Sequence, residues 1–365
     1  MSRLARHNPF ACAGSEMPPN ALLLAKLIAL CLLLKGYFSA IVPAFLPFLP
    51  ILEYNPTALQ QILQVAFVIS IPALLFNIAP RSAALTLGLV MLLAIAASKP
   101  GYLNATVYTG CILLLAGLQS RTGTIWLLRA QIALLYLGAA INKIFEADWW
   151  TGVYVENWLV AILTNPYYET LTSFFPPMAL SRMLGWTAIA VELFVGVAVL
   201  SRAGRPAAIW IAAVFHIGVL LMTHQDFGIF LTAIFASFLA LIDWPASVRA
   251  SIGDRHVLSR LTHAVGKRLD VDRIVRWEPA ADRDEGLTLD TGRSSLQGGE
   301  AFARLLLLFP PVYFALALLL TGPKWVRWWS ALLALLLFTP WMTMSRVAAS
   351  DRSRGSERER AQTPG

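Results

Sequence analysis

Cysteine and charge are both scarce in this chain. Its 365 residues include three cysteines, Cys12, Cys31 and Cys111, which are scattered and show no C-x-x-C spacing. This pattern argues against a disulfide scaffold, a zinc site or a dithiol redox centre, and we predict no metal site. The sequence also lacks a glycine-rich phosphate loop, a nucleophile elbow and an H-E-x-x-H motif, so it carries none of the common signatures of nucleotide, serine-hydrolase or zinc-protease chemistry.

Hydrophobic residues dominate what remains. Charged residues make up 14% of the chain and hydrophobic residues 57%, with a mean hydropathy of +0.63. A soluble domain does not need so many apolar residues to fill its core, so we predict an integral membrane protein in the inner (plasma) membrane, with the lipid bilayer as its first partner. The net charge of +8 comes from arginines in short loops and in the C-terminal tail. That distribution fits the positive-inside rule and argues against nucleic-acid binding.

Apolar runs of about 20 residues, the length that crosses a bilayer as a helix, recur along the chain. We expect an all-α polytopic membrane protein with about ten transmembrane helices, a small α+β cytoplasmic insert and both termini cytoplasmic. The predicted spans are residues 21–40, 60–79, 82–98, 102–119, 124–145, 180–200, 207–223, 227–242, 303–320 and 325–344. The predicted domains are a cytoplasmic segment (1–20), a membrane domain (21–245), the insert (246–302), two further spans (303–345) and a disordered basic tail (346–365).

One apolar helix ends in an ionisable residue. In residues 131–152, QIALLYLGAAINKIFEADWWTG, Lys143 closes the helix and an acidic, tryptophan-rich turn follows. Tyr136 lies seven residues earlier and shares a face of the helix with Lys143. An ionisable group at this depth marks a functional site by default, and a dehydrated lysine can act as a base near neutral pH. Alternatively, Lys143 extends to the interface or pairs with Glu146 or Asp148.

Two more polar residues fall inside predicted spans. Glu192, in AIAVELFVGV, has nothing within a turn of its own helix to pair with, so its partner must come from another helix. A carboxyl at this depth marks a proton path, an ion site or an interhelical hydrogen bond. His216, in AAVFHIGVLL, can shuttle protons or bond a backbone carbonyl as an ordinary core histidine. We assign catalytic roles to Lys143, His216 and Glu192, and substrate contacts to residues around them: Gln131, Tyr136, Asp148, Trp149, Gly152, His224 and Asp226.

Two segments outside the predicted spans differ from them in composition and pattern. The loop of residues 146–181 is dense in aromatic residues, which is typical either of a cap that lies on or re-enters the membrane or of an aromatic belt at the headgroup level. The insert shows a helical pattern near residues 255–268 and strand-like runs at 273–277 and 286–289. The insert is too short to bury a large core alone, so we expect it to pack against the membrane helices or a partner.

Residues 131–244 resemble the HTTM membrane domain that is shared with vitamin K-dependent gamma-glutamyl carboxylase. The residues that carry the resemblance, in chain order, are Lys143, Glu146, Ala147, Asp148, Trp149, Gly152, Glu192, Phe215, His216, Asp243, Trp244 and Pro245. The insert is similar to the end of a DCC module, a small thiol-disulfide oxidoreductase domain, with a helix start at Gly299 and Ala301. The paired cysteines of that module are missing, so the resemblance implies its shape only.

The HTTM resemblance implies a helical membrane enzyme in which a lysine on the extracytoplasmic side deprotonates a reduced quinone. Oxygenation of that hydroquinone then makes a strong base. This base removes a proton from glutamate, so that carbon dioxide can add. This chain departs from the carboxylase pattern, because Ile144 stands where the carboxylase has its second lysine, the proposed base. It also lacks the large domain that binds the carboxylase's peptide substrate, so full carboxylase activity is not expected.

Two functional hypotheses follow. The first is an enzyme, carboxylase-like or a quinone-linked oxidoreductase or lyase, in which Lys143 abstracts a proton from a quinone-like or lipidic small molecule in an extracytoplasmic cavity. The quinone or hydroquinone would be its cofactor or substrate. The second is a transporter, or a helper in maturation of or immunity to an exported peptide, in which the same buried charges form a proton path or fix helix contacts.

Overall fold

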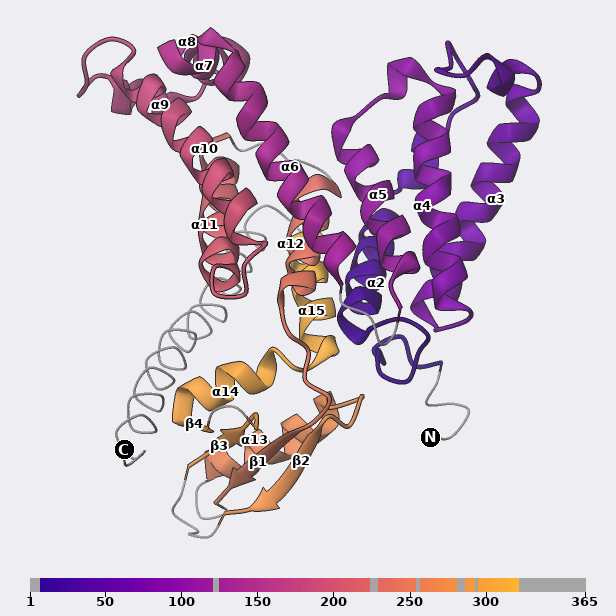
Figure 1. Ribbon diagram of the computed structural model, residues 1–365, viewed down its shortest axis with the longest axis vertical. Helices are drawn as coiled ribbons and strands as arrows, with labels where there is room; N and C mark the ends of the chain where they lie inside the picture. Colours follow the sequence, from indigo (N-terminus) through magenta and orange to yellow (C-terminus); the bar gives the residue numbers. More distant parts are fainter. Residues whose placement is uncertain are drawn as a thin grey trace, which may run out of the picture.

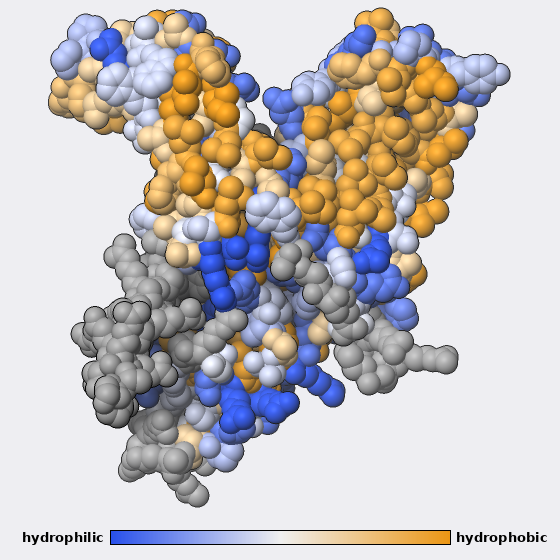
Figure 2. All heavy atoms as spheres, viewed as in Figure 1, coloured by the Kyte–Doolittle hydropathy of each residue, from blue (hydrophilic) through white to orange (hydrophobic). Residues whose placement is uncertain are grey.

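The computed structural model describes residues 7–120, 125–223, 229–253, 257–280, 286–292 and 295–321. Within these residues, helices form two arms that diverge from a shared base, and a four-stranded sheet lies beyond the base (Figure 1). The exterior of both arms is strongly apolar, whereas the sheet end is mostly hydrophilic (Figure 2). The molecule therefore has the surface of a protein whose arms lie in lipid.

The first arm packs three helices side by side. Its elements are α2 (Pro19–Leu34), η1 (Tyr37–Ala40), η2 (Pro50–Glu53), α3 (Pro56–Leu75), α4 (Pro80–Ala97), η3 (Lys99–Gly101) and α5 (Asn104–Leu118). Helices α4 and α5 approach closely, because a Cβ at Gly88 would lie 2.8 Å from the carbonyl oxygen of Gly110. On α3, Ile62, Val65 and Ile69 are all more than half exposed, so this side faces lipid.

The second arm carries the segment that the sequence singles out. Its elements are α6 (Trp126–Phe145), α7 (Ala147–Thr151), α8 (Val153–Glu156), the π-helix η4 (Asn157–Ile162), α9 (Pro166–Thr172), α10 (Ala179–Ala198) and α11 (Arg205–Thr223). Helix α10 packs along α6 and α11, while α7 to α9 cover the end of α6 that lies away from the sheet (Figure 1).

The base joins the two arms through one apolar core. Helix α2 buries 12 of its 16 residues and contacts α3, α5, α12 (Ile229–Ser237), η5 (Phe238–Leu241) and α15 (Pro310–Thr321). A helix that is apolar all round is stable where either protein neighbours or lipid surround it, and for α2 the observed burial shows that protein neighbours do. The hydropathy of α2 therefore reflects its place at the centre of the protein.

The insert folds as a small α/β unit. Strand β1 (Val248–Ile252) pairs in parallel with β2 (Val275–Pro279) through the crossover helix α13 (Val257–Leu269), and β3 (Thr288–Asp290) and β4 (Ser295–Gln297) complete the sheet in the order β2-β1-β3-β4. Helix α14 (Gly298–Leu306) packs on β3 and β4. The predicted helix and both strand-like runs are confirmed, whereas the sequence analysis does not predict β1 or β4.

The N-terminal segment links the insert to the membrane base. The Asp272 carboxylate accepts hydrogen bonds from the backbone N–H groups of Cys12 and Ala13 at 2.8 and 2.9 Å. The Lys26 ammonium, fully buried, donates to the carbonyls of Pro9 and Ala11, both at 2.8 Å. Burial raises the pKa of the Cys12 thiol to about 12, so Cys12 stays protonated and unreactive.

The described residues do not support the prediction of about ten transmembrane helices. Among the described residues, four helices, α3, α4, α6 and α10, are long and apolar enough to cross a bilayer, or five if α14 and α15 count as one bent span. Three other predicted spans fall on helices that are shorter than a bilayer requires, namely α2 with 16 residues, α5 with 15 and α12 with 9. The predicted span 303–320 breaks, since α14 and α15 meet at 74°. The predicted span 325–344, the basic tail and both termini lie outside the described residues.

Close packing of α10 on α6 yields a prediction. A Cβ at Gly196 would lie 2.6 Å from the Leu137 side chain, whereas nothing lies within 4 Å of a Cβ at Gly138 on α6. We expect Gly196→Ala to lower the free energy of unfolding by about 1–3 kcal/mol, because the two helices must separate. Gly138→Ala, the matched control, should be neutral or stabilising by up to about 1 kcal/mol. Thermal unfolding in detergent measures both, and equal effects would contradict the packing argument.

Candidate functional site

Lys143 and Glu192 form an ion pair between α6 and α10. The Lys143 ammonium donates to both carboxylate oxygens of Glu192, at 2.8 and 2.9 Å, and the two side chains are only 16% and 10% exposed. The partner of Glu192 thus comes from another helix, as the sequence predicts. The ammonium also lies 3.4 Å from the carbonyl oxygen of Ala139, one turn back along α6. Lys143 therefore points back along its own helix instead of extending to the outer interface.

Helix α10 presents one continuous face to α6, and this face sets the position of Glu192. Its buried residues recur every three or four positions: Ser181, Gly185, Ala188, Ile189, Glu192, Val195, Gly196 and Ala198. The small residues in this series let the helices approach closely, as in other membrane helix pairs. Glu192 sits between two such contacts, Gly185 against the backbone of Trp149 and Gly196 against Leu137. The carboxylate is therefore held in one register along α6.

Tryptophans of α7 cover the ion pair. The Lys143 ammonium lies 4.8 Å from the centre of the Trp149 ring, which is close enough for a cation–π interaction. That ring stacks on Tyr154 with centroids 4.3 Å apart. The Trp150 indole donates to the Ile144 carbonyl at 2.8 Å, and the Trp186 indole of α10 donates to the Trp150 carbonyl at 3.1 Å. These bonds fix α7 against the ends of both helices.

Tyr136 and His216 form a second polar pair. The Tyr136 hydroxyl lies 2.8 Å from Nε2 of His216, which joins α6 to α11. Phe230 and Phe235 of α12 pack their ring edges against the imidazole, with centroids 6.4 and 6.5 Å away. Tyr136 is buried. The arrangement is a hydrogen bond inside an aromatic box, in which either partner can donate depending on the tautomer of the histidine.

The two pairs lie along one face of α6. Tyr136 and Lys143 are seven residues apart, which is about 10 Å along the axis. The three predicted catalytic residues therefore come from three helices, α6, α10 and α11, but only Lys143 and Glu192 contact each other, while His216 bonds to Tyr136. Direct proton transfer between the pairs needs a bridging group at this spacing, which a ligand can supply.

The other predicted contact residues have different surroundings. Gln131 lies about 18 Å from Lys143 along the α6 axis. Asp148 is exposed at the start of α7. Gly152 has a φ of 86°, and a Cβ there would lie 2.6 Å from the Arg182 backbone nitrogen, so its role is a tight turn over the end of α10. His224 and Asp226 lie outside the described residues.

The aromatic loop folds into a helical cap with a small core of its own. Val155, Leu159 and Tyr168 are buried within it. The Asn165 side chain accepts from the backbone N–H groups that begin α9 and donates to the Met222 carbonyl of α11. The Tyr168 hydroxyl donates to the Glu156 carboxylate. Burial and this carboxylate raise the pKa of Tyr168 to about 12, so the phenol keeps the proton that it donates.

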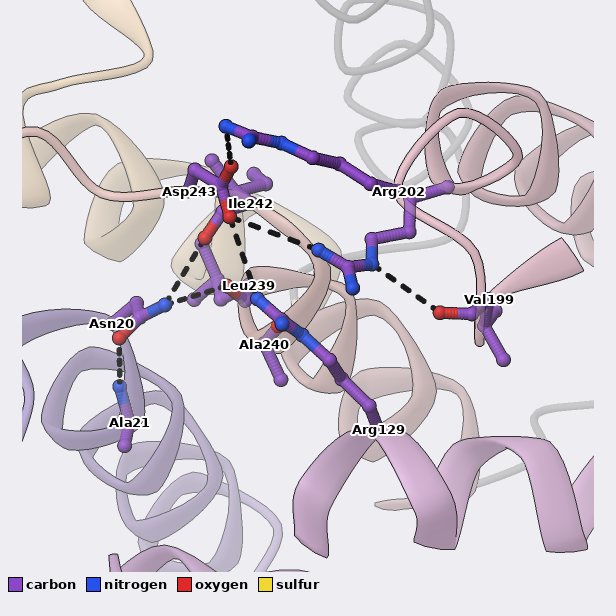
Figure 3. A network of polar contacts seen from close by, with 10 residues as sticks. Asn20, Ala21, Arg129, Val199, Arg202, Leu239, Ala240, Ile242 and Asp243 are labelled. Carbon is purple, nitrogen blue, oxygen red and sulfur yellow. Dashed lines mark hydrogen bonds and ion pairs between the residues drawn. The ribbon is translucent and has the colours of Figure 1, made fainter. Parts of the chain in front are cut away.

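A third polar cluster lies at the opposite end of α6. Three arginines converge on the Asp243 carboxylate: Arg202 at 2.8 Å, Arg129 at 3.5 Å and Arg205 at 3.7 Å. Figure 3 shows Arg129 and Arg202 reaching Asp243 from opposite sides. The sequence places arginines in short loops, as the positive-inside rule expects on one side of the membrane, but it does not identify Asp243 as the shared partner of these three. The signal was there, since Asp243 is the acidic residue that closes the eighth predicted span on that side.

These polar contacts lie in a segment of the chain that matches a known domain family. Residues 121–244 match the HTTM domain. The match covers about a third of the chain and contains the ion pair, the Tyr136–His216 pair and Asp243. No curated protein and no solved structure matches the chain. The match and the apolar helices together indicate a membrane protein that contains an HTTM-like segment. Within the described residues, no three His, Cys, Asp or Glu side chains are grouped so that they could hold a metal ion.

The ion pair yields a second prediction. We expect Lys143→Met to lower the free energy of unfolding by up to about 3 kcal/mol, because it leaves the Glu192 carboxylate without a countercharge among apolar helices. The double variant Lys143→Met/Glu192→Gln should recover most of that loss, since no unpaired charge remains. Thermal unfolding in detergent measures the cycle, with Asp148→Asn as the exposed control. A double variant as unstable as the sum of the single variants would contradict the pairing.

Proposed function

We propose that this HTTM-type membrane protein is an enzyme that moves protons to and from a quinone-like or lipidic small molecule on the side of the aromatic cap. The observation that carries the proposal is the Lys143–Glu192 pair, in which both carboxylate oxygens accept from one ammonium between two apolar helices. Charged groups are costly in such surroundings and are retained where a proton or an ion must be handled. A purely structural contact between α6 and α10 would need no charge at all.

The pair supplies a base by an internal proton transfer. If the ammonium of Lys143 passes its proton to Glu192, a neutral amine and a neutral carboxylic acid result. In apolar surroundings this neutral form is disfavoured less than in water, because separated charges lose their solvation there. The amine can then accept the proton of a hydroxyl group on the bound molecule, which leaves an anion beside the ammonium that forms. The partly exposed Tyr154 ring, which stacks on Trp149, offers an aromatic surface for a flat ring.

The contact with Glu192 supports Lys143 as the base, although the next residue departs from the carboxylase pattern. In the carboxylase pattern the second of two lysines takes that role, and here Ile144 stands at its position. The Ile144 carbonyl accepts from the Trp150 indole, while the Lys143 ammonium contacts Glu192. The lysine that this chain retains is thus the one with a carboxylate to exchange protons with. This supports proton abstraction without implying peptide carboxylation.

The alternative is a non-enzymatic transporter, or a helper for an exported peptide. The observation that favours it is a series of polar contacts between apolar helices. Along α6 the ion pair is followed by the Tyr136–His216 pair, and a Tyr108–Ser237 hydrogen bond of 3.0 Å joins α5 to α12. Polar groups spaced in this way across apolar helices are typical of proton paths.

For the insert we propose a DCC-like domain without redox activity. Its support is the topology, a parallel pair joined by a helix and followed by an antiparallel pair and a second helix. None of the three cysteines of the chain, Cys12, Cys31 and Cys111, belongs to the insert. The insert therefore has no cysteine for thiol-disulfide chemistry. The hydrogen bonds between the insert and the N-terminal segment are consistent with a structural role.

The enzyme proposal predicts a bound small molecule. Mass spectrometry of the protein purified in mild detergent should find a quinone or a related ring-containing lipid at near-stoichiometric amount with the wild type. Addition of the reduced form should give turnover that Lys143→Gln and Glu192→Gln each reduce by at least about 100-fold, the usual scale for loss of a positioned base. Glu169→Gln, which changes an exposed residue of α9, is the control. Each variant is first checked for unaltered gel filtration and unfolding temperature.

The same variants separate the two functions. In proteoliposomes that contain a pH-sensitive dye, an enzyme shows no proton flux without its substrate, whereas a transporter shows flux that Glu192→Gln abolishes. Proton flux that depends on Glu192, together with no retained ring compound, would replace the enzyme proposal with the transport one. Turnover that survives the loss of both Lys143 and Glu192 would refute the assignment of the base.

A further inference from the structure

The arginine cluster at the sheet end of the membrane helices holds more positive charge than its carboxylate can neutralise. Arg129 comes from α6, Arg202 from the turn after α10 and Arg205 from the first residue of α11, and all three contact Asp243 within 3.7 Å. Arg304 of α14 also interacts electrostatically with this carboxylate. Among the described residues, the carboxylate that forms ion pairs with Arg129, Arg202 and Arg205 is that of Asp243. The cluster therefore carries an excess positive charge.

Two of the arginines are fixed in place by the backbone. The Arg129 side chain donates to the Ala240 carbonyl at 2.8 Å and the Arg205 side chain to the Val199 carbonyl at 3.3 Å, and both side chains are only 12% exposed. Close by, Asn20 of α2 donates to the carbonyls of Leu239 and Ile242 (Figure 3). The guanidinium groups are thus held together on a rigid frame despite their mutual repulsion. Such an arrangement is favourable when an anion completes it.

The cluster is accessible and retains unused hydrogen-bond donors. Arg202 and Asp243 have side chains that are 56% and 47% exposed. Each guanidinium has five N–H donors in a planar fork, and the contacts described above use only some of them. Arginine forks match the oxygen geometry of phosphate groups. The open side of the cluster therefore offers several donors that phosphate oxygens can accept from.

The place of the cluster identifies the source of the phosphate. Arg129 is one turn from the start of α6, Arg205 starts α11, and Asp243 follows the last turn of η5. These are the ends of apolar helices, where the apolar surface of the arms gives way to the hydrophilic sheet end (Figure 2). Phosphate headgroups of a bilayer leaflet lie at such a boundary, and basic pockets between membrane helices bind them.

We propose that Arg129, Arg202 and Arg205 form a binding site for the phosphate of an anionic phospholipid headgroup in the leaflet next to the sheet. Asp243 spaces the guanidinium groups and neutralises part of their charge, and the lipid phosphate neutralises more. The acyl chains extend along the apolar surface of the arms. The bound lipid thereby fixes the ends of α6 and α11 and the chain that leads into β1.

Lipid retention tests this site. The full-length protein is reconstituted in nanodiscs of an equal mixture of phosphatidylcholine and phosphatidylglycerol, extracted gently and analysed by native mass spectrometry. The wild type should retain phosphatidylglycerol in preference to phosphatidylcholine. Arg202→Gln should lower that retention about fivefold, the effect of one arginine contact near a membrane surface. Arg182→Gln, which removes an exposed arginine at the other end of α10, is the matched control and should have no effect.

A gain of binding keeps the test informative if a variant is destabilised. Asp243→Asn removes the carboxylate that competes for the guanidinium groups, so it should increase retention of phosphatidylglycerol, an outcome that misfolding does not produce. Equal loss with Arg182→Gln, or no preference for the anionic lipid in the wild type, would refute the proposal. Displacement of the lipid by millimolar inorganic phosphate would show that the site takes a free anion, and would refute the lipid assignment.

Discussion

The pairing of polar side chains on the inward face of α6 is the constraint on which the rest of the structure depends. Arg129, Tyr136 and Lys143 recur at intervals of seven residues, so they share one face of this helix. A helix of 3.6 residues per turn drifts by only about 20° per seven residues, so the three side chains remain in line. Each of them would be costly among apolar helices without a partner.

Each partner comes from a different part of the chain, and this explains how the second arm is assembled. Arg129 pairs with Asp243 after η5, Tyr136 with His216 on α11, and Lys143 with Glu192 on α10. Apolar packing alone would let α10 and α11 slide or rotate against α6, since lipid is as apolar as their own side chains. Directional bonds at three heights remove that freedom, and the glycines of α10 allow the close approach that the bonds require.

Much of this site could be predicted from the sequence, but the pairings could not. Glu192 lacks a partner on its own helix, so a partner on another helix follows directly, and the common face of Tyr136 and Lys143 follows from their spacing. Which residue meets Glu192 depends on the relative height of α6 and α10, which the distant contacts at Gly185 and Gly196 determine. The number of spans was overestimated for a related reason. Hydropathy cannot distinguish a helix buried in protein, such as α2, from one in lipid.

The direction of the Lys143 side chain favours the pair with Glu192 over an interaction of the ammonium with lipid headgroups. A lysine near the end of a membrane helix lowers its free energy most simply by extending its ammonium to the headgroups. Glu146 and Asp148 follow directly and are exposed, so they offer acceptors in that direction. Instead the ammonium turns back to the level of the Ala139 carbonyl and to Glu192, and Trp149 covers it. The cost of desolvating two charges is offset in part by the fixed position of α10 on α6, and under the proposed function the same two groups also share the proton that is moved.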